Sequence, residues 1–257
     1  TLGRGGSDAT AISIAKFFSA DDCFIYTDVS GVYTTDPKLN SKAKKIKKIS
    51  YEEMLEMASL GAKIMQPISL QDAMINDIDI NVRSTFINSN GTKISNNQQL
   101  FNKNPITGIA FTKNEAKITL IGVMDRPGTA ASIFKPLADN QINVDMVVQT
   151  SSPDGGQTDI TFTIIKDDVK NCIKILKENK KISYKKIIHD DKVSKVSIVG
   201  AGMIATPGVT YRMFQALAKK KINIMVISTS EIKISVLINQ KNIKKAIRVL
   251  HKEFDLD

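Results

Sequence analysis

An internal repeat limits the folds open to this chain more than any other feature. The segment "PGTAASIFKPLADNQINVDMVV" at 127–148 aligns with "PGVTYRMFQALAKKKINIMVIS" at 207–228 at a constant offset of 80 residues. Each copy follows a β-rich run and precedes another β-rich run and a helical pattern, which predicts a ferredoxin-like β-α-β-β-α unit. Two copies predict a pseudo-symmetric pair of small α+β domains. The identical positions are Pro127/Pro207, Gly128/Gly208, Phe134/Phe214, Leu137/Leu217, Ala138/Ala218, Ile142/Ile222 and Asn143/Asn223.

Each copy also carries a Pro-Gly pair where its first helix is expected to begin, and an asparagine where the chain turns toward the next strand. A helix N-terminus presents free N–H groups that can bind a carboxylate, and glycine lets a ligand approach the backbone. The same residues also commonly mark helix ends and turns. Two interpretations stay open on the residues alone: a ligand site in each copy, or turn residues with a structural role.

The first 86 residues alternate helix and strand signals, which predicts helices around a largely parallel sheet. "SDATAISIAKFF" has helical spacing, "CFIYTDV" suits a buried strand, and Ser50 and Glu53 form a capping-box pattern before "MLEMASLGAKIM". The polar, Asn-rich stretch 87–105 is typical of a linker. We therefore divide the chain into an α/β part at 1–86, a linker at 87–105, and two α+β domains at 106–190 and 191–257.

The charge balance raises the question of nucleic acid, because 36 Lys and Arg against 26 Asp and Glu give a net charge of +10 over 257 residues. Surfaces that bind nucleic acid favour arginine and interleaved aromatic residues. Here lysine supplies most of the positive charge, tryptophan is absent and aromatics make up 6%. We therefore expect a solvated lysine-rich surface and no nucleic-acid partner. The absence of a long apolar run predicts no membrane span, and the two cysteines, without metal-binding spacing, favour a reducing cytoplasm.

A glycine-rich stretch, "GRGGSD" at residues 3–8, lies immediately before an expected helix. Its glycines permit close backbone approach, and the helix points N–H groups at the loop. Arg4 can grip a carboxylate or phosphate through two N–H groups, and Asp8 could orient a lysine or a metal. On its own the pattern is weak, because glycine-rich turns before helices are common.

A second group of polar residues supports phosphate chemistry. Thr27 and Asp28 follow an expected strand, at the end where open α/β sheets bind ligands. Tyr33 offers a flat ring, and Lys63 offers a point charge suited to a transferring phosphoryl group. A turn role for Asp28 and a surface role for Lys63 are the alternatives. Neither histidine accompanies a nucleophile motif, and no residue is assigned to a metal.

Together these motifs resemble those of the aspartate kinase family, and the resemblance covers essentially the whole chain. It implies an amino-acid-kinase fold, a three-layer α/β sandwich present in part, followed by two ferredoxin-like ACT domains that sense amino acids. The stretches that carry it, in the family's order, are "TLGRGGSD", "YTDVSGVYTTDP", "ISYEEMLEMASLGAKIM", "EAKITLIGVMDRPG", "INVDMVVQ" and "ISTSEIKISVLI".

The resemblance implies ATP-dependent phosphorylation of L-aspartate to 4-phospho-L-aspartate, the first step toward lysine, threonine, methionine and bacterial diaminopimelate. ATP would act with Mg²⁺, and lysine or threonine would act as feedback effector. The implied catalytic residues are Asp8 and Lys63, the aspartate-binding residues Arg4, Gly5, Gly6 and Ser7, and the ATP-binding residues Thr27, Asp28, Tyr33, Lys38, Lys63 and Ile64. The implied effector-binding residues are Asp125, Thr129, Ala130, Gln149, Asn223, Ile224, Ser230 and Glu231.

The sequence also departs from the family pattern. The family's first strand and Lys-Phe/Tyr-Gly-Gly-Thr-Ser loop, which supplies a catalytic lysine, has no counterpart here. Lys38 replaces the usual arginine and loses its planar fork. We therefore expect negligible kinase activity from this chain alone, and a homo-oligomer through the ACT domains, possibly with a separate chain that carries the missing half. A non-catalytic regulatory subunit is the alternative, although such subunits normally begin near the equivalent of residue 106.

Overall fold

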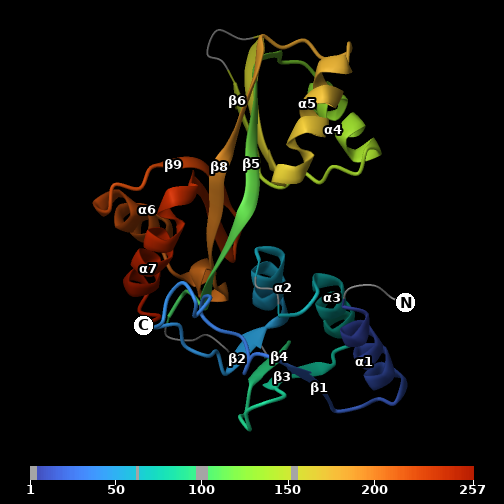
Figure 1. Ribbon diagram of the computed structural model, residues 1–257, viewed down its shortest axis with the longest axis vertical. Helices are drawn as coiled ribbons and strands as arrows, with labels where there is room; N and C mark the ends of the chain where they lie inside the picture. The colour runs from blue at the N-terminus through green and yellow to red at the C-terminus, as the bar shows by residue number, and fades with distance from the viewer. Residues whose placement is uncertain (1–4, 62–63, 97–103, 152–155) are drawn as a thin grey trace.

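The computed structural model describes the whole chain except residues 1–4, 62–63, 97–103 and 152–155. The described residues form an N-terminal lobe (residues 5–96) and two repeat lobes that share one long sheet (Figure 1). No helix among them is both long enough and apolar enough to span a bilayer.

The N-terminal lobe contains a four-stranded sheet in the order β1-β3-β4-β2. Its strands are β1 (Asp22–Thr27), β2 (Lys48–Ser50), β3 (Asp79–Ser84) and β4 (Thr92–Ser95). The pairs β1/β3 and β2/β4 are parallel, and β3/β4 is antiparallel. The sheet is therefore mixed, and β1 forms one of its edges.

Three helices cover one face of this sheet (Figure 1): α1 (Gly6–Phe17), α2 (Tyr51–Ser59) and α3 (Pro67–Ile75). Ile12 of α1, Met54 of α2 and Leu70 of α3 are buried in one core with Ile25 and Ile80 of the sheet. The apolar periodicity that predicts these helices therefore corresponds to the faces that they bury.

The segment expected to be a linker contains part of this sheet. Residues 92–95 form β4, which lies between β2 and β3, and Ile94 is fully buried. A strand with one large apolar residue has no detectable period, and its pairing with distant strands decides its structure. Composition therefore does not reveal this strand.

The second sheet has six strands in the order β6-β7-β5-β8-β10-β9. Two long strands, β5 (Gly108–Met124) and β8 (Lys186–Val199), run side by side through both repeat lobes. The first repeat lobe adds β6 (Val147–Ser151) and β7 (Gln157–Ile164), and the second adds β9 (Ile224–Thr229) and β10 (Lys233–Asn239). Residues 108–112 pair with 195–199, so the start of β5 supplies the second repeat lobe with its fourth strand.

Each repeat lobe has two α-helices on its part of the sheet. The first carries α4 (Thr129–Asp139) and α5 (Val169–Glu178), and the second carries α6 (Val209–Lys219) and α7 (Ile243–Glu253). Short 3₁₀ turns lie at η1 (Lys166–Asp168), η2 (Ala201–Ala205) and η3 (Gln240–Asn242). Each lobe has its own main apolar core, and a smaller cluster of Met146, Val193, Val226 and Leu237 joins the two lobes.

The repeat extends to backbone torsions. Gly128 and Gly208 are the N-caps of α4 and α6, with φ of 89° and 88°. Past the ends of these helices, Gln141 and Lys221 are both left-handed, with φ of 58° and 55°. Glycine relieves the strain of this conformation at the N-caps, so the Pro-Gly pair has a structural reason independent of any ligand.

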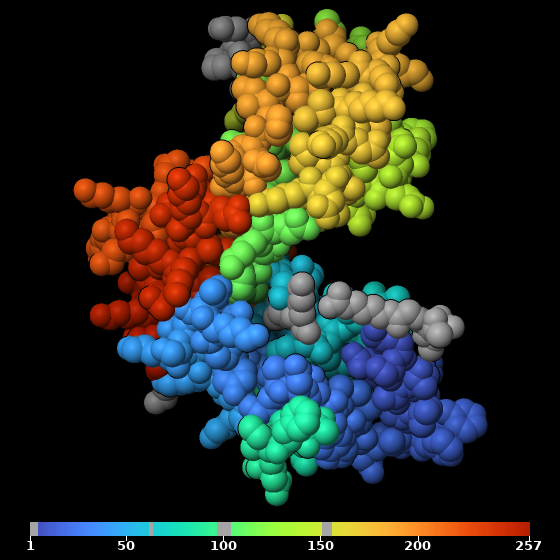
Figure 2. Space-filling view, viewed as in Figure 1, coloured from blue at the N-terminus to red at the C-terminus, as the bar shows by residue number. Residues whose placement is uncertain are grey.

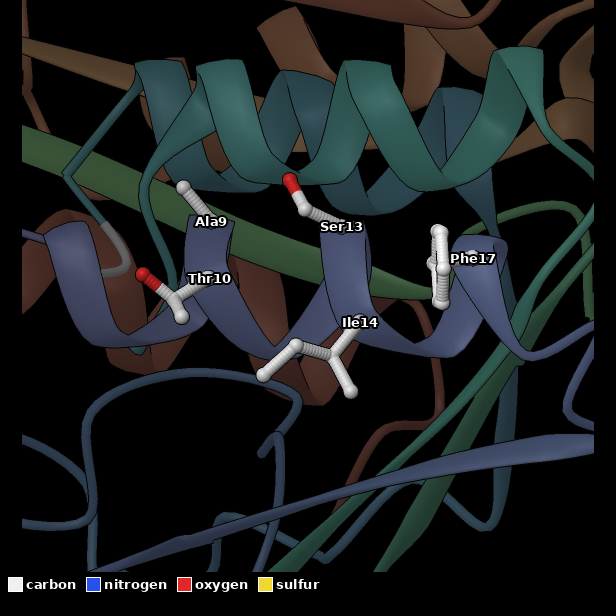
Figure 3. Close-up of a pocket in the computed structure, with 5 residues that line it drawn as sticks. All are labelled: Ala9, Thr10, Ser13, Ile14 and Phe17. Atoms are coloured by element: carbon white, nitrogen blue, oxygen red, sulfur yellow. The ribbon is translucent and has the colours of Figure 1, made fainter.

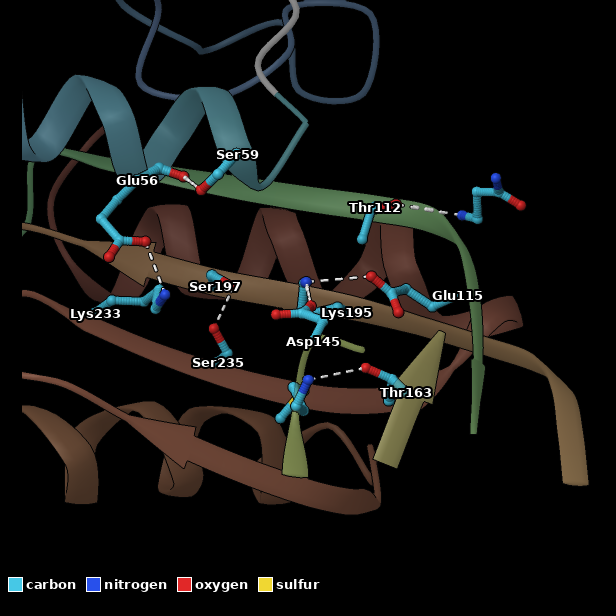
Figure 4. A network of polar contacts seen from close by, with 12 residues as sticks. Glu56, Ser59, Thr112, Glu115, Asp145, Thr163, Lys195, Ser197, Lys233 and Ser235 are labelled. Atoms are coloured by element: carbon cyan, nitrogen blue, oxygen red, sulfur yellow. Dashed lines mark hydrogen bonds and ion pairs between the residues drawn. The ribbon is translucent and has the colours of Figure 1, made fainter. Parts of the chain in front are cut away.

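The second repeat lobe packs against the N-terminal lobe, whereas the first stands away from it across a hollow (Figure 2). Two contacts of α2 contribute to this packing. Glu53 accepts a hydrogen bond from the backbone N–H of Ala201 at 2.9 Å, and Glu56 pairs with Lys233 at 2.7 Å (Figure 4). The second repeat lobe and the N-terminal lobe are therefore joined by polar contacts as well as by the chain.

Candidate functional sites

The glycine loop enters α1 through a backbone conformation that favours glycine. Gly5 is the N-cap of α1 with φ of 79°, and a Cβ added to it would lie 2.1 Å from Cγ of Gln66. Gln66 is the residue before α3. Gly5 and Gln66 therefore lie against each other, although they are far apart in the sequence.

Asp8 lies in the first turn of α1, where a carboxylate interacts favourably with the helix dipole. Burial nevertheless raises the pKa of Asp8 above its usual range, and a hydrogen bond from Ser7 partly opposes this effect. Ser7 is exposed, and Gly5 and Gly6 are half-buried. The predicted aspartate-binding residues at 5–7 thus line the loop around a partly desolvated carboxyl, while Arg4 lies outside the described residues.

Thr27 and Asp28 lie at the carboxyl end of β1. The Thr27 hydroxyl donates a hydrogen bond to Asp28 at 3.1 Å, and the Thr27 carbonyl accepts one from the N–H of Thr85, just after β3. Because β1 and β3 are parallel, their carboxyl ends meet at one edge of the sheet, where open α/β sheets bind ligands. The predicted position of these residues at the end of a strand is confirmed.

The chain from Asp28 to Lys47, which we call the nucleotide loop, contains further predicted ATP-binding residues. Tyr33 is half-buried. Its hydroxyl forms a hydrogen bond with that of Ser30 at 2.8 Å, and its backbone pairs with Lys45 in an isolated β-bridge. Lys38 is exposed, and its backbone N–H donates to Asp36 at 2.8 Å. The loop is therefore folded on itself. Its lysines are exposed except Lys45, which is half-buried and bonds to Ser89 at 3.3 Å.

The remaining predicted nucleotide contacts follow α2. Ile64 is half-buried and packs against the core of the N-terminal lobe, two residues before Gln66. Lys63 lies outside the described residues. Gly61 fixes the end of α2 against the second repeat lobe, because its added Cβ would lie 2.4 Å from the carbonyl oxygen of Phe111 in β5.

The outer face of α1 is unusually apolar for exposed surface. Figure 3 shows Ala9, Thr10, Ser13, Ile14 and Phe17 along this face, which we call the α1 face. Ile14 is 53% exposed and Phe17 is 81% exposed. The α1 face adjoins β1, the edge strand, and parallel strands are normally covered on both sides.

The predicted effector residues fall into two groups. Asp125, Thr129 and Ala130 surround the N-terminus of α4, where the left-handed Gly128 has open space around it. No side chain caps this helix end. The N–H of Thr129 already donates to the carbonyl of Arg126 at 3.2 Å, so the following N–H groups of the first turn are the ones suited to meet an anion. Gln149 lies in β6, at one edge of the six-stranded sheet.

The second group lies in the second repeat lobe. Asn223 immediately precedes β9, Ile224 begins it, and Ser230 and Glu231 lie in the turn between β9 and β10. All but Ile224 are exposed. Among the described residues, no hydrogen bond or ion pair joins the two groups within the chain.

The sequence does not single out His251, although the structure gives it a central place. His251 is fully buried on α7, and its ring nitrogens contact Thr34 of the nucleotide loop and Asp257, each at 2.8 Å. Its position on the apolar face of α7 is the only available signal, because that face otherwise carries Ile243, Ile247 and Leu250. A buried histidine at such a position requires polar partners.

Comparisons with known proteins place these lobes in families. The amino acid kinase family matches residues 1–84, and the ACT domain family matches residues 118–179 and 196–254. The chain therefore combines part of an amino-acid-kinase α/β fold with two ferredoxin-like ACT domains, which correspond to the repeat lobes.

The most informative relatives are all aspartate kinases. The chain is 46% identical to aspartokinase of Corynebacterium glutamicum over 260 residues, which covers 100% of this chain and 62% of the relative. It matches the crystal structure of Clostridium acetobutylicum aspartate kinase with a TM-score of 0.89 and 29% identity, over 99% of this chain and 59% of that one. A structure of aspartokinase alpha and beta subunits is 47% identical with a TM-score of 0.54, over 58% of this chain and 99% of that one. The chain belongs to the aspartate kinase family.

Two structures of Escherichia coli aspartokinase III carry ligands. One is a complex with aspartate and ADP, with a TM-score of 0.81 and 27% identity over 99% of this chain and 57% of that one. The other is a complex with lysine and aspartate, with a TM-score of 0.77 and 28% identity over 99% of this chain and 56% of that one. The present chain thus spans less than two thirds of the length of these relatives.

Proposed function

We propose that this chain forms part of a cytoplasmic aspartate kinase, which transfers the γ-phosphoryl group of ATP to the side-chain carboxylate of L-aspartate. The approach of Gly5 to Gln66 carries the proposal, because it brings the predicted aspartate loop beside the segment that follows Lys63 and Ile64. The aspartate and ADP bound to Escherichia coli aspartokinase III support the same pair of ligands.

In this proposal Arg4, Gly5, Gly6 and Ser7 bind aspartate, and Asp8 orients the groups around it. Thr27, Asp28, Tyr33, Lys38, Lys63 and Ile64 bind ATP. Phosphoryl transfer depends mainly on positioning and on cations that neutralise charge on the moving group, which is the role proposed for Lys63.

Mg²⁺ would arrive with the nucleotide phosphates. In the part of the chain that the structure describes, no three His, Cys, Asp or Glu side chains gather into a metal-binding group. In this proposal the task of this chain is to hold the nucleotide and the acceptor carboxylate. The ion would supply charge neutralisation for the transferring group.

Formation of aspartyl hydroxamate tests the kinase proposal. The chain is incubated with L-aspartate, Mg-ATP and hydroxylamine, with and without a polypeptide of the preceding kinase segment of the Corynebacterium glutamicum relative. We expect negligible product from the chain alone and clear product from the pair. A stable complex of the two that forms no hydroxamate would contradict the proposal.

We further propose that the repeat lobes bind lysine or threonine as a feedback effector. Asp125 and Glu231 suit the effector ammonium, and the free N-terminus of α4 suits its carboxylate. Thr129, Ala130, Gln149, Asn223, Ile224 and Ser230 would complete the contacts. The lysine in the second Escherichia coli structure supports this class of ligand.

Because no hydrogen bond or ion pair joins the two groups of effector residues among the described residues of one chain, we propose that a second copy completes the site through the edge strands β6 and β9. Val147 of β6 is 49% exposed and Ile227 of β9 is 42% exposed, so each edge presents apolar surface. Lysine or threonine at millimolar concentration should raise the melting temperature of the chain, because a ligand that binds the native state stabilises it. Sedimentation in the same buffers should show a dimer that the effector strengthens.

A regulatory subunit without catalytic function is the second candidate. The aspartokinase subunit structure that matches only 58% of this chain supports it. The N-terminal lobe, with its glycine loop and nucleotide loop, favours the kinase assignment. Failure of hydroxamate formation together with an effector-dependent rise in melting temperature would support the regulatory subunit instead.

A further inference from the structure

His251 of the second repeat lobe holds the nucleotide loop through a chain of hydrogen bonds. Nε2 of His251 lies 2.8 Å from Oγ1 of Thr34, and Nδ1 lies 2.8 Å from Oδ1 of Asp257. The other carboxylate oxygen of Asp257 accepts a hydrogen bond from Lys42, also at 2.8 Å. A continuous polar chain therefore begins and ends in the nucleotide loop, at Thr34 and Lys42, and passes through α7.

The hydrogen-bond roles in this chain follow from Thr34. Its Oγ1 already accepts the backbone N–H of Lys44 at 3.0 Å, so the hydroxyl proton is available for Nε2 of His251. Nε2 then accepts, and the ring proton lies on Nδ1, which donates to Asp257. Hydrogen bonds from Lys42 and His251 lower the pKa of Asp257, which keeps it an acceptor.

Thr34 is also fixed through its backbone. Its carbonyl accepts a hydrogen bond from the N–H of Ile109, in β5, at 2.7 Å, and its N–H donates to the carbonyl of Lys44 at 2.9 Å. Thr34 is thus held from α7, from β5 and from the loop itself. Its neighbour Tyr33 carries one of the proposed nucleotide contacts, so the orientation of Tyr33 depends on these bonds.

Simple packing does not account for this arrangement. His251 is fully buried beside the apolar side chains of Ile247 and Leu250, where an apolar residue would avoid the cost of desolvating an imidazole. The ring instead satisfies both nitrogens, and one of its partners belongs to a different lobe. Arg248 of α7 also donates to the carbonyl of Leu39 in the nucleotide loop, at 3.2 Å.

We propose that His251 is a positioning residue through which the second repeat lobe sets the conformation of the nucleotide loop. The link from this loop to ATP rests on the proposed function, but the link from His251 to the loop does not. Occupancy of a ligand site in the second repeat lobe would reach the nucleotide loop through α7, and nucleotide binding would reach α7 by the same bonds.

Hydrogen exchange of the full chain tests the proposal. The reporters are the amides of Thr34, Ile46 and Ile109, whose hydrogen bonds to backbone carbonyls hold the loop and do not involve the Thr34 side chain. We expect His251→Phe and Thr34→Val to speed their exchange by roughly 10-fold, and Thr34→Ser, which keeps the hydroxyl, to restore protection. Thr34→Val gives a second variant should His251→Phe fail to fold.

Ser197→Ala is the matched control. Ser197 is fully buried in the second repeat lobe and hydrogen-bonds to Ser235 at 2.7 Å, so its loss removes a buried polar contact without touching the loop. Equal exchange of the reporter amides in wild type, His251→Phe and Thr34→Val would overturn the proposal. An equal acceleration in Ser197→Ala would also overturn it, because the effect would then be general destabilisation.

Calorimetric titration with Mg-ADP separates this proposal from the proposed function. If the wild-type chain binds ADP, His251→Phe should weaken binding by about 10-fold, and unchanged affinity would overturn the positioning role. If the wild-type chain does not bind ADP, the assignment of the nucleotide site fails, and hydrogen exchange alone decides whether His251 positions the loop.

Discussion

Gly5 and Gly208 adopt the same left-handed N-cap conformation in different surroundings. An added Cβ at Gly5 would meet Gln66, whereas one at Gly208 would meet nothing within 4 Å. Gly208→Ala should therefore lower the free energy of unfolding only by the torsional strain of a left-handed alanine, about 1–2 kcal/mol. Gly5→Ala should cost roughly 2–4 kcal/mol, because Gln66 must also move. Urea unfolding of both variants measures the difference, and equal costs would contradict the close approach.

Lys195 forms a buried ionic cluster at the junction of the two repeat lobes (Figure 4). Its ammonium lies 3.1 Å from Glu115 and also contacts Asp145, and both Lys195 and Glu115 are almost fully buried. Burial raises the pKa of Glu115, and Lys195 opposes that rise. Lys195→Met should cost about 3–5 kcal/mol at neutral pH, because it leaves a buried carboxylate without its cation.

The stability of Lys195→Met should depend on pH in a direction set by Glu115. A carboxyl with a raised pKa in the folded state favours folding when protonated, and this contribution is lost as the pH rises through that pKa. The stability deficit of Lys195→Met should thus be smaller near pH 5 than near pH 8. Chemical unfolding at both pH values measures it, and the double variant with Glu115→Gln should lose the pH dependence. A deficit that grows toward acid would contradict the role of Glu115.

Single residues differ in how far the sequence reveals them. Asp8, Thr27 and Asp28 are predictable because their place at a helix start or a strand end follows from local patterns. Lys195 and His251 are not, because Lys195 pairs with Asp145, 50 residues away, and His251 bonds to Thr34, 217 residues away, besides its near neighbour Asp257. A buried charge inside a strand or an apolar helix face is visible in the sequence, but the partner that satisfies it is set by tertiary packing.

At the scale of elements, α2 shows how a local signal acquires a second role. The predicted capping box is confirmed: Ser50 accepts the N–H of Glu53, and the Glu53 carboxylate accepts the N–H of Ser50. Glu53 also accepts hydrogen bonds from Thr107 at 2.7 Å and from Ala201 at 2.9 Å. The same carboxylate therefore caps the start of α2 and joins two lobes.

These two roles predict that substitutions at Ser50 and Glu53 lower the free energy of unfolding by different amounts. Ser50→Ala should cost about 1 kcal/mol, the usual loss for an N-cap. Glu53→Ala should cost roughly 2–4 kcal/mol, because the half-buried donors of Thr107 and Ala201 lose a charged acceptor. Exposed Glu52→Ala serves as the control in the same turn. Denaturant unfolding checks the order, and equal losses in Ser50→Ala and Glu53→Ala would show that Glu53 acts only as a cap.

The extent and pairing of the strands are harder to predict from the sequence than the helices are. The repeat predicts α4, α6 and the strands around them, because each copy has its own apolar period. The repeat does not predict that β5 and β8 extend through both lobes, or that residues 108–112 complete the sheet of the second repeat lobe. Strand pairing is non-local, so the register of β5 with β8 depends on contacts that no sequence window contains.

At the scale of the whole molecule, one surface stands out from the rest. The α1 face exposes Ile14 and Phe17, and the neighbouring edge strand β1 exposes Phe24 at 44% and Tyr26 at 60%. An apolar face beside a parallel edge strand is normally covered. This chain covers 62% of the Corynebacterium glutamicum relative, and β1 is an edge strand of its sheet.

We therefore expect the α1 face to bind the preceding kinase segment of a relative. The double variant Ile14→Ser/Phe17→Ser should unfold within about 0.5 kcal/mol of wild type, because both side chains are largely exposed. It should nevertheless lose most of its co-elution with that segment in size-exclusion chromatography, and with it any hydroxamate formation. Ile204→Ser is the matched control, since Ile204 is 64% exposed in the second repeat lobe, away from this face. If the double variant and the control bind the segment equally well, the contact between the two kinase parts lies elsewhere on the N-terminal lobe.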